Sequence, residues 1–354
     1  MHYLKFFLFH FYALVGIVSL SLGGMWIVAG FLFTLMSIIL GDLMLGDDLS
    51  EPAPKANVFY HWQLWSALPL LSVLIFSAIW QLARATGEID LIWWVAVFYC
   101  GLLTGTLGTV TAHELVHRKW GSTAHSIGRW LLAFSFDSNF AIEHVFGHHI
   151  NIATTQDAAS APRGRNVYQH MVISTIQGNI SAWNIEKKRL LRTNTAVLSL
   201  QNRFIHGVIL SLILMLISYV LGGLSGLLFF VLSGVIAKSL LEIVNYMEHY
   251  GLVRVPGKRV FPRHSWNANN KISSWSLFNL TRHSHHHANA NVPFQYLKPM
   301  KEAPLMPTGY LGTLGLTLVP PLWFYLMKPR LAAWDEQFAS PEERQWLLKQ
   351  NEQH

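Results

Sequence analysis

The sequence has little cysteine and little charge, and each shortage excludes a class of protein. Its 354 residues contain one cysteine, Cys100, so the chain can build neither a disulfide scaffold nor a four-thiolate iron site. Asp, Glu, Lys and Arg make up only 13% of the residues, about half the share usual in soluble domains. A soluble fold of this length could not cover its surface with so few charges, and a disordered chain would be more polar.

Hydrophobic residues make up 52% of the chain, and they gather into long runs. A membrane-spanning helix needs about 20 such residues. Glycine pairs at 23–24 and 222–223 indicate tight connections between neighbouring helices. A seventh apolar stretch, 305–327, contains Pro320 and Pro321, so we expect an interfacial or re-entrant segment there. The pattern predicts an all-α integral membrane protein with six transmembrane helices, Leu4–Gly23, Met25–Leu45, Trp62–Ala83, Leu91–Ala112, Phe204–Gly222 and Leu224–Val244.

The positive charges are distributed unevenly around these six runs. If all six cross the membrane, the N-terminal side holds 24 of the 26 Lys and Arg residues, and the other two are Arg84 and Lys238. Cytoplasmic segments carry the excess of Lys and Arg, so the N-terminus and the long polar segments are predicted to be cytoplasmic. The net charge of +7 then reflects orientation and contact with anionic membrane lipid. No basic helix with interleaved aromatic residues indicates a nucleic acid partner.

Histidine is present in excess, with 18 residues against 19 acidic ones. Ten of them form four groups, all on the predicted cytoplasmic side. Neutral imidazole is the commonest metal ligand in proteins, and a spacing of four residues places two rings on one helix face. The four groups therefore predict metal binding, and they contain His113 and His117, then His144, His148 and His149, then His249, and finally His283, His285, His286 and His287.

The number of imidazoles indicates how many ions they hold. One zinc ion takes three or four protein ligands, so nine or ten imidazoles suit two ions better than one. Imidazole binds iron, zinc, copper and nickel alike. Lys238, inside the sixth run, is expected to extend its ammonium group toward the membrane surface. Several polar neighbours are expected to hydrogen-bond to ligand rings and fix their tautomers, namely Glu114, Glu143, Asp157, Glu248, His264 and His285.

These boxes resemble those of a known family. The stretches H-E-L-V-H (113–117), E-H-V-F-G-H-H (143–149), N-Y-M-E-H-Y-G-L (245–252) and R-H-S-H-H-H (282–287) resemble the membrane-bound di-iron alkane monooxygenases, part of the wider membrane fatty acid desaturase and hydroxylase group. The resemblance covers about residues 25–335. The last box usually has an acidic residue where this chain has His285, and residues 288–294 lack an expected arginine. The stretches 236–238, 252–254 and 328–344 are more similar to the hydroxylase component of xylene monooxygenase.

The resemblance implies a metal centre and a domain plan. Two non-haem iron ions would be held on the cytoplasmic side of the bacterial inner membrane, with O2 as co-substrate. Membrane helices would occupy 1–112 and 204–244, and histidine-bearing cytoplasmic segments 113–203 and 245–354. The implied ligands are nine histidines, His113, His117, His144, His148, His149, His249, His283, His286 and His287.

The implied activity is hydroxylation of a terminal or methyl C–H bond of a hydrophobic small molecule, with an n-alkane preferred, to a primary alcohol. The reaction needs two electrons, but the chain has one cysteine and no G-x-G-x-x-G motif after a strand. An external donor is therefore expected, and the family uses rubredoxin or a ferredoxin-type reductase. Because the cytoplasmic face is basic, we expect the donor to be acidic.

Three other functions compete with this one. Oxidation of a methyl group on an aromatic ring, as in xylene, and desaturation or hydroxylation of a fatty acid use the same kind of metal centre. An intramembrane zinc protease is a third, because H-E-L-V-H also matches H-E-x-x-H, with Glu114 as general base. The protease alternative leaves seven histidines without a role.

Overall fold

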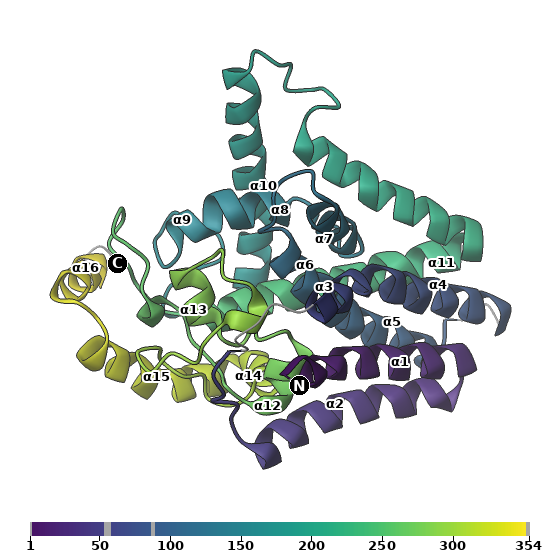
Figure 1. The fold of residues 1–354 in the computed structure, drawn as a ribbon, viewed down its shortest axis with the longest axis horizontal. Coiled ribbons are helices and arrows are strands. Elements are labelled where there is room, and N and C mark those ends of the chain that lie inside the picture. The colour runs from purple at the N-terminus through teal and green to yellow at the C-terminus, as the bar shows by residue number, and fades with distance from the viewer. Residues whose placement is uncertain (1, 53–57, 86–88, 352–354) are drawn as a thin grey trace.

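A computed structural model of the chain describes residues 2–52, 58–85 and 89–351 and is built from helices (Figure 1). Within these ranges there is no β-sheet, only isolated bridges joining Asp47 to Asn270 and Asn267 to Leu305. The predicted all-α membrane architecture is confirmed. Five stretches are long and apolar enough to cross a bilayer, His2–Leu22, Met25–Leu45, Val58–Arg84, Leu91–Leu115 and Arg203–His249.

These five stretches form the bundle on the right of Figure 1. Large apolar side chains along them are exposed, as expected of surfaces that face lipid tails rather than water. The stretches contain the helices η1 (His2–Phe6), α1 (Phe7–Leu22), α2 (Met25–Leu45), α3 (Val58–Trp65), α4 (Ala67–Ala85), α5 (Leu91–Leu103), the π-helix η2 (Thr104–Val110), α6 (Thr111–Leu115) and α11 (Arg203–His249).

The longest helix, α11, doubles back on itself. Its 47 residues would extend about 70 Å if straight, more than twice the apolar thickness of a bilayer. Helical geometry breaks at Gly223, where φ is +59°, a value that favours glycine. The Cβ position at Gly226 lies 2.6 Å from the backbone oxygen of Ser218, so the two halves of α11 touch. They coincide with the fifth and sixth predicted spans, while the number of membrane crossings stays a prediction.

The proline-containing stretch near the C-terminus is also bent. Helices α14 (Tyr310–Thr317) and α15 (Pro320–Gln337) meet at 119°. Pro320 begins α15, a position where its missing N–H and fixed φ are tolerated. The bend agrees with the proline pair, and the interfacial placement of this segment stays a prediction.

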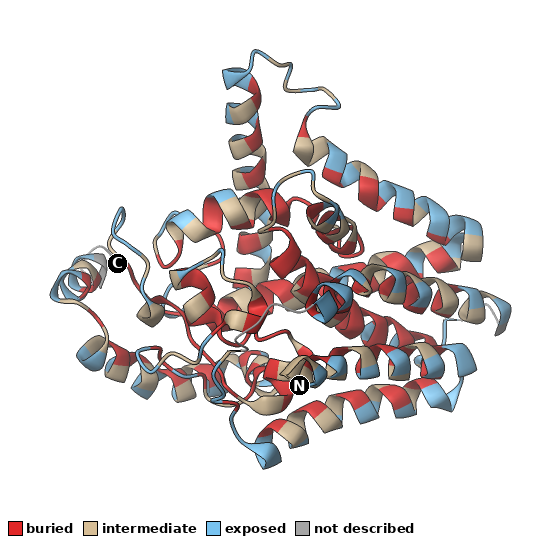
Figure 2. Cartoon of the chain, viewed as in Figure 1, coloured by how far each residue is buried: buried red, intermediate tan, exposed pale blue. Residues whose placement is uncertain are grey.

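The remaining helices gather at the left and top of Figure 1. Figure 2 shows most of the buried residues where these helices meet the membrane bundle. One apolar cluster fills the bundle, and a second surrounds Trp266, Trp323 and Trp334. The remaining helices are α7 (Thr123–Ala133), α8 (Phe140–Glu143), the π-helix η3 (His144–His148), α9 (His149–Asn151), α10 (Val167–Arg192), η4 (Pro262–His264), α12 (Lys271–Ser276), α13 (His283–Ala288), η5 (Phe294–Tyr296) and α16 (Pro341–Asn351).

Lys238 pairs with two carboxylates, and the expected direction of its side chain toward the membrane surface stays a prediction. Its ammonium group lies 2.8 Å from a carboxylate oxygen of Asp137 and 2.6 Å from one of Glu242. An unpaired charge inside an apolar bundle is costly. The two carboxylates within reach compensate the charge of the lysine.

One buried carboxylate of the C-terminal helix α16, that of Glu343, connects this helix to the segment around Arg263 and His264. Glu343 accepts hydrogen bonds from Arg263 Nε at 3.0 Å, His264 Nε2 at 2.8 Å and the Ser340 backbone N–H at 2.8 Å. Burial alone would raise the pKa of Glu343, but these hydrogen bonds lower it to about 2. The carboxylate therefore stabilises the fold in its ionised form.

We predict that Glu343→Gln destabilises the protein by about 2 kcal/mol at neutral pH, because hydrogen bonds to a charged group are lost. The neighbouring Glu342 is the matched control, since it makes only an exposed ion pair with Lys258. Because the folded pKa lies below the ordinary value, the contribution of Glu343 is present above about pH 4.5 and is lost toward pH 2. The melting temperatures of Glu343→Gln and Glu342→Gln would be measured in detergent across this pH range. Their difference should shrink as the pH falls below 4.5, and a difference that does not depend on pH would contradict the assignment.

Candidate metal centre

The nine histidines expected to bind metal come from separate parts of the chain and meet in one place. The ends of the membrane helices α6 and α11 supply three of them. The short helices η3, α9 and α13 supply the other six. Histidines three to five residues apart in a box lie on one side of a helical turn, so their rings can reach the same point. The adjacent pairs, His148–His149 and His286–His287, divide between two groups.

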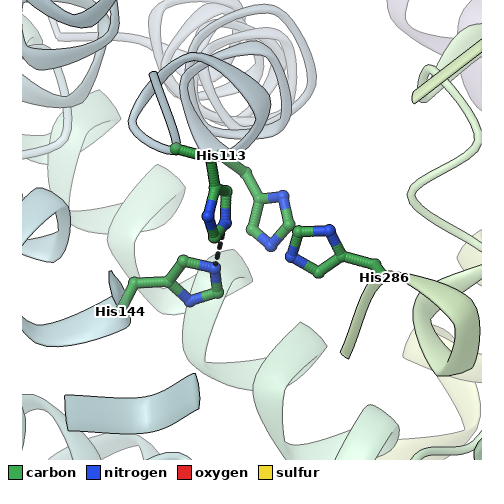
Figure 3. A group of neighbouring side chains, drawn as sticks. His113, His144 and His286 are labelled. Atoms are coloured by element: carbon green, nitrogen blue, oxygen red, sulfur yellow. Dashed lines mark hydrogen bonds between the residues drawn. The ribbon is translucent and has the colours of Figure 1, made fainter. Parts of the chain in front are cut away.

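One group consists of His113, His117, His144 and His286, whose candidate ligand atoms all lie within 4.8 Å of one another. In Figure 3, His113, His144 and His286 point toward one another from three different elements. The Nε2 atoms of His117 and His144 are 3.1 Å apart. His113 Nε2 is buried and has no hydrogen-bond partner among the described residues.

A second group consists of His148, His249, His283 and His287, again with ligand atoms within 4.8 Å of one another. All four side chains are buried. Successive Nε2 atoms are separated by 3.3 Å between His148 and His287, 2.7 Å between His287 and His283, and 3.2 Å between His283 and His249.

The two remaining histidines of the boxes differ in position. His149 Nε2 lies 3.0 Å from His144 Nε2 and 3.2 Å from His286 Nε2, so it joins the first group. His285 faces away from the cluster, and its Nδ1 accepts the backbone N–H of Lys298 at 3.1 Å. The fold thus brings together the nine expected residues as a set of five and a set of four, and it leaves His285 outside.

The electrostatics of the cluster favour neutral rings. Burial, followed by the neighbouring imidazoles, holds the pKa of His144, His149, His283, His286 and His287 well below its usual value. The pKa of His117 falls to about 4, through burial and then the charge of Arg118. Neutral imidazoles with converging nitrogen lone pairs are the form that binds a metal cation. The donor set and the unpartnered nitrogen of His113 therefore fit two metal ions.

A buried aspartate orients one ring of the second group. His148 Nδ1 lies 2.9 Å from a carboxylate oxygen of Asp157, which also accepts the Ser160 hydroxyl at 2.6 Å. Burial alone would lower the pKa of His148, but the Asp157 carboxylate raises it. With Nδ1 engaged in this way, Nε2 is left to face the metal position, the usual arrangement of a histidine ligand and its carboxylate.

Glu248 contacts the second group as well. One of its oxygens lies 3.1 Å from His283 Nε2, and the hydroxyl of Tyr310 donates to the same carboxylate. The histidine boxes gave no signal for Tyr310, which lies 62 residues from Glu248. Only the tertiary structure connects Tyr310 to the metal centre.

The other polar neighbours named from the sequence have different partners. Glu114 pairs with Arg118 one helical turn away, and His264 binds Glu343. Glu143 lines a small polar cavity beside the cluster, together with Lys238 and Glu242. Burial, followed by the charge of Asp157, raises the pKa of Glu143 to about 8. Of the six residues, only Asp157 and Glu248 have a polar contact with a ring of the cluster.

An apolar cavity leads to the histidines. It encloses an empty volume of about 850 Å³, part of it open to the outside. Its walls come from the α5–η2 stretch, the second half of α11, α12 and α14, with side chains such as Leu102, Val110, Leu240 and Leu314. His113, His144 and His283 line the same cavity. A hydrophobic molecule in this cavity would be in contact with the metal-binding rings.

Residues 91–317 match the family model for fatty acid desaturases. The chain is 34% identical to alkane 1-monooxygenase 1 of Pseudomonas aeruginosa, over 88% of this chain and 83% of that protein. It is 32% identical to the xylene/toluene monooxygenase hydroxylase component XylM of Pseudomonas putida, over 98% of this chain and 94% of that one. The chain belongs to the fatty acid desaturase family, on the branch of the alkane 1-monooxygenases.

Membership of this branch confirms the resemblance drawn from the histidine boxes. The chain is an oxidoreductase of the membrane monooxygenase class. A third relative, alkane 1-monooxygenase 2 of Alcanivorax borkumensis, is 32% identical over 88% of this chain and 84% of its own length. The long apolar helices agree with an integral membrane enzyme.

Two neighbouring histidines of the last box provide a test of the ligand set. We predict that His286→Ala lowers the iron content of the purified protein and abolishes activity, because His286 faces His113 and His149. His285→Ala, one residue away, should keep its iron, since that ring faces Lys298. Metal analysis of both variants is the measurement. Equal iron content in the two would contradict the assignment.

Proposed function

We propose that this enzyme hydroxylates a terminal or methyl C–H bond of a hydrophobic substrate, with an n-alkane preferred, to give a primary alcohol. One observation carries the proposal: nine histidines, seven of them buried, face one another where an apolar cavity ends. The overall reaction consumes the substrate, one O2, two electrons and two protons, and it produces the alcohol and one water. One oxygen atom enters the product and the other enters the water.

We infer that the cluster holds two non-haem iron ions. The five-membered set is His113, His117, His144, His149 and His286, and the four-membered set is His148, His249, His283 and His287. When bound, the iron pair would supply the reduction of O2 and the attack on an unactivated C–H bond. Imidazole alone does not select iron, so the choice of metal rests on the monooxygenase relatives.

The chain's own residues position the substrate and the ligands. Leucine and valine side chains along the cavity would align a hydrocarbon chain and exclude water from its walls. Asp157 and Glu248 hold rings of the second group, and Tyr310 holds Glu248. Buried polar contacts of this kind hold ligand rings in place while the substrate enters and the product leaves.

The electrons are proposed to come from outside the chain. Cys100 is buried and is the sole cysteine, so no thiolate iron site is available to carry them. A rubredoxin or a ferredoxin-type reductase is the proposed donor. The site is proposed to face the cytoplasm from the inner membrane of a bacterium, on the side that holds most of the Lys and Arg residues.

Methyl-aromatic oxidation is the second candidate, because XylM aligns over nearly the whole chain. Fatty acid desaturation or hydroxylation is less favoured, since the relatives named here are alkane and xylene/toluene monooxygenases. The zinc protease alternative has little support. Glu114 would have to act as general base, yet its carboxylate pairs with Arg118.

Product analysis tests the proposal. Cells that produce the enzyme with a reductase system would be supplied separately with octane, a long-chain alkane and p-xylene. We predict that gas chromatography detects 1-alkanols as the main products. A preference for p-xylene would favour the second candidate, and a new double bond without alcohol would contradict hydroxylation.

A matched pair of variants tests whether the substrate binds in the apolar cavity. Leu314→Trp would fill part of the cavity and should lower alkane oxidation several-fold without loss of iron, whereas Leu318 does not line the cavity. Leu318→Trp adds the same bulk outside the cavity and should leave both alkane oxidation and iron content unchanged. Equal activity of the two variants would show that the substrate binds elsewhere.

The positive charge proposed for the cytoplasmic face predicts that electron transfer from the donor depends on salt concentration. If an acidic donor docks on basic residues, turnover with limiting donor should fall as ionic strength rises, because salt screens their attraction. Steady-state rates between low and physiological salt measure this effect, with a small-molecule reductant as the control. Turnover that does not respond to salt would contradict electrostatic docking.

A further inference from the structure

A second polar pocket lies apart from the histidine cluster, between α7 and the start of α11. We call it the arginine pocket. It is lined by Trp120, His125, Arg129, Arg203 and His206, with Leu200 and Leu210 among its apolar residues. None of these residues belongs to the nine-histidine cluster or to the apolar cavity that leads to it.

Arg129 is the buried cation of the arginine pocket, with only 6% of the residue exposed. One terminal nitrogen lies 2.9 Å from His206 Nδ1, and the other donates to the backbone oxygen of Arg203 at 2.6 Å. Its Nε is buried and has no hydrogen-bond partner among the described residues. Burial, followed by the charge of Arg203, lowers the pKa of Arg129 to about 10, so the guanidinium remains charged at neutral pH.

Arg203 adds a second cation on the same indole ring. Its guanidinium carbon lies 3.9 Å from the centre of the Trp120 ring, and that of Arg129 lies 5.3 Å from it. Within the described part of the chain, neither arginine has a carboxylate within ion-pair distance. Glu186 is nearby, but Arg189 and the backbone N–H of Arg203 occupy its oxygens. The charge of Glu186 acts on both pocket arginines, but Glu186 is already paired with Arg189, so the pocket keeps a net positive charge.

His125 supplies a further unsatisfied polar atom. Its Nε2 is buried without a hydrogen-bond partner in the described residues, and its ring packs 4.2 Å from that of Trp120. Burial, followed by the charges of Arg129 and Arg203, lowers the pKa of His125 to about 4, so the ring is neutral. Buried polar groups normally have partners. The free nitrogens of Arg129 and His125 therefore indicate that a ligand with acceptor oxygens completes the pocket.

The surroundings of the pocket are those of a membrane boundary. Arg203 is the first residue of the apolar α11 stretch. The loop between α10 and α11, at the top of Figure 1, exposes Leu198 and Leu200 by more than 80%. Further along α11, Ile213 and Ile217 are exposed on the helix face that carries His206. Tryptophan and arginine are typical of the level of lipid headgroups, and leucines of the layer beneath.

We propose that the arginine pocket binds the phosphate of an anionic phospholipid whose acyl chains lie along the first half of α11. Guanidinium groups recognise phosphate oxygens through paired, charge-assisted hydrogen bonds. Two charges without a carboxylate partner favour a lipid with net negative charge over a zwitterionic one. A single ligand of this kind satisfies the cations and covers the exposed leucines.

Native mass spectrometry of the detergent-purified protein tests the proposal. The protein would be titrated with phosphatidylglycerol and, separately, with phosphatidylcholine of the same chain length. We expect wild type to bind phosphatidylglycerol about tenfold more tightly than phosphatidylcholine, and Arg203→Gln to lose this preference. Arg192→Gln is the matched control, because that exposed arginine lies outside the pocket and should keep the preference.

Two further arms complete the experiment. Arg203→Lys keeps the charge and should retain part of the preference, which separates loss of the site from loss of the fold. Equal lipid binding by Arg203→Gln and Arg192→Gln would overturn the proposal. If inorganic phosphate raised the melting temperature of the delipidated protein as much as short-chain phosphatidylglycerol, free phosphate would be the ligand and the lipid assignment would be wrong.

Discussion

The rest of the structure depends on holding nine imidazoles beside one another, most of them buried and with the pKa lowered by burial. A protonated ring in the cluster would be repelled by its neighbours and would lose its hydration. Each ring is held by a short helical turn, and the turns are held by the membrane bundle on one side and the tryptophan-rich cluster on the other. The π-helical turns η2 and η3 occur near His113 and at His144–His148, where the helices are adjusted locally to aim these rings.

Two cavities of different polarity lie beside the histidine cluster. One side is an apolar cavity that suits a hydrocarbon, and the other is a polar cavity with the Lys238, Asp137 and Glu242 charges. His144 lines both. Such an arrangement places Lys238, Asp137 and Glu242 outside the apolar cavity while leaving ligand rings in contact with it. The arginine pocket belongs to neither side.

Much of the metal centre could be predicted from the sequence, because imidazoles at helical spacing are a local signal for metal binding that does not depend on the tertiary fold. The nine expected histidines lie together in the structure. Sequence reasoning missed Tyr310 and Glu343, since each acts through a contact with a residue more than 60 positions away. It also did not indicate the ion pair of Lys238 with Asp137, because a span viewed alone does not show which residue lies beside it.

Composition and periodicity by themselves determined that the chain is a helical membrane protein with a histidine-rich metal site. Both properties follow from local patterns, namely the length of apolar runs and the spacing of ligands. Only the tertiary structure decided which histidines share a metal position, that His285 faces away, and that two arginines meet on Trp120. These outcomes depend on how distant helices pack, and packing sets the direction of a side chain in a way that spacing along one helix does not.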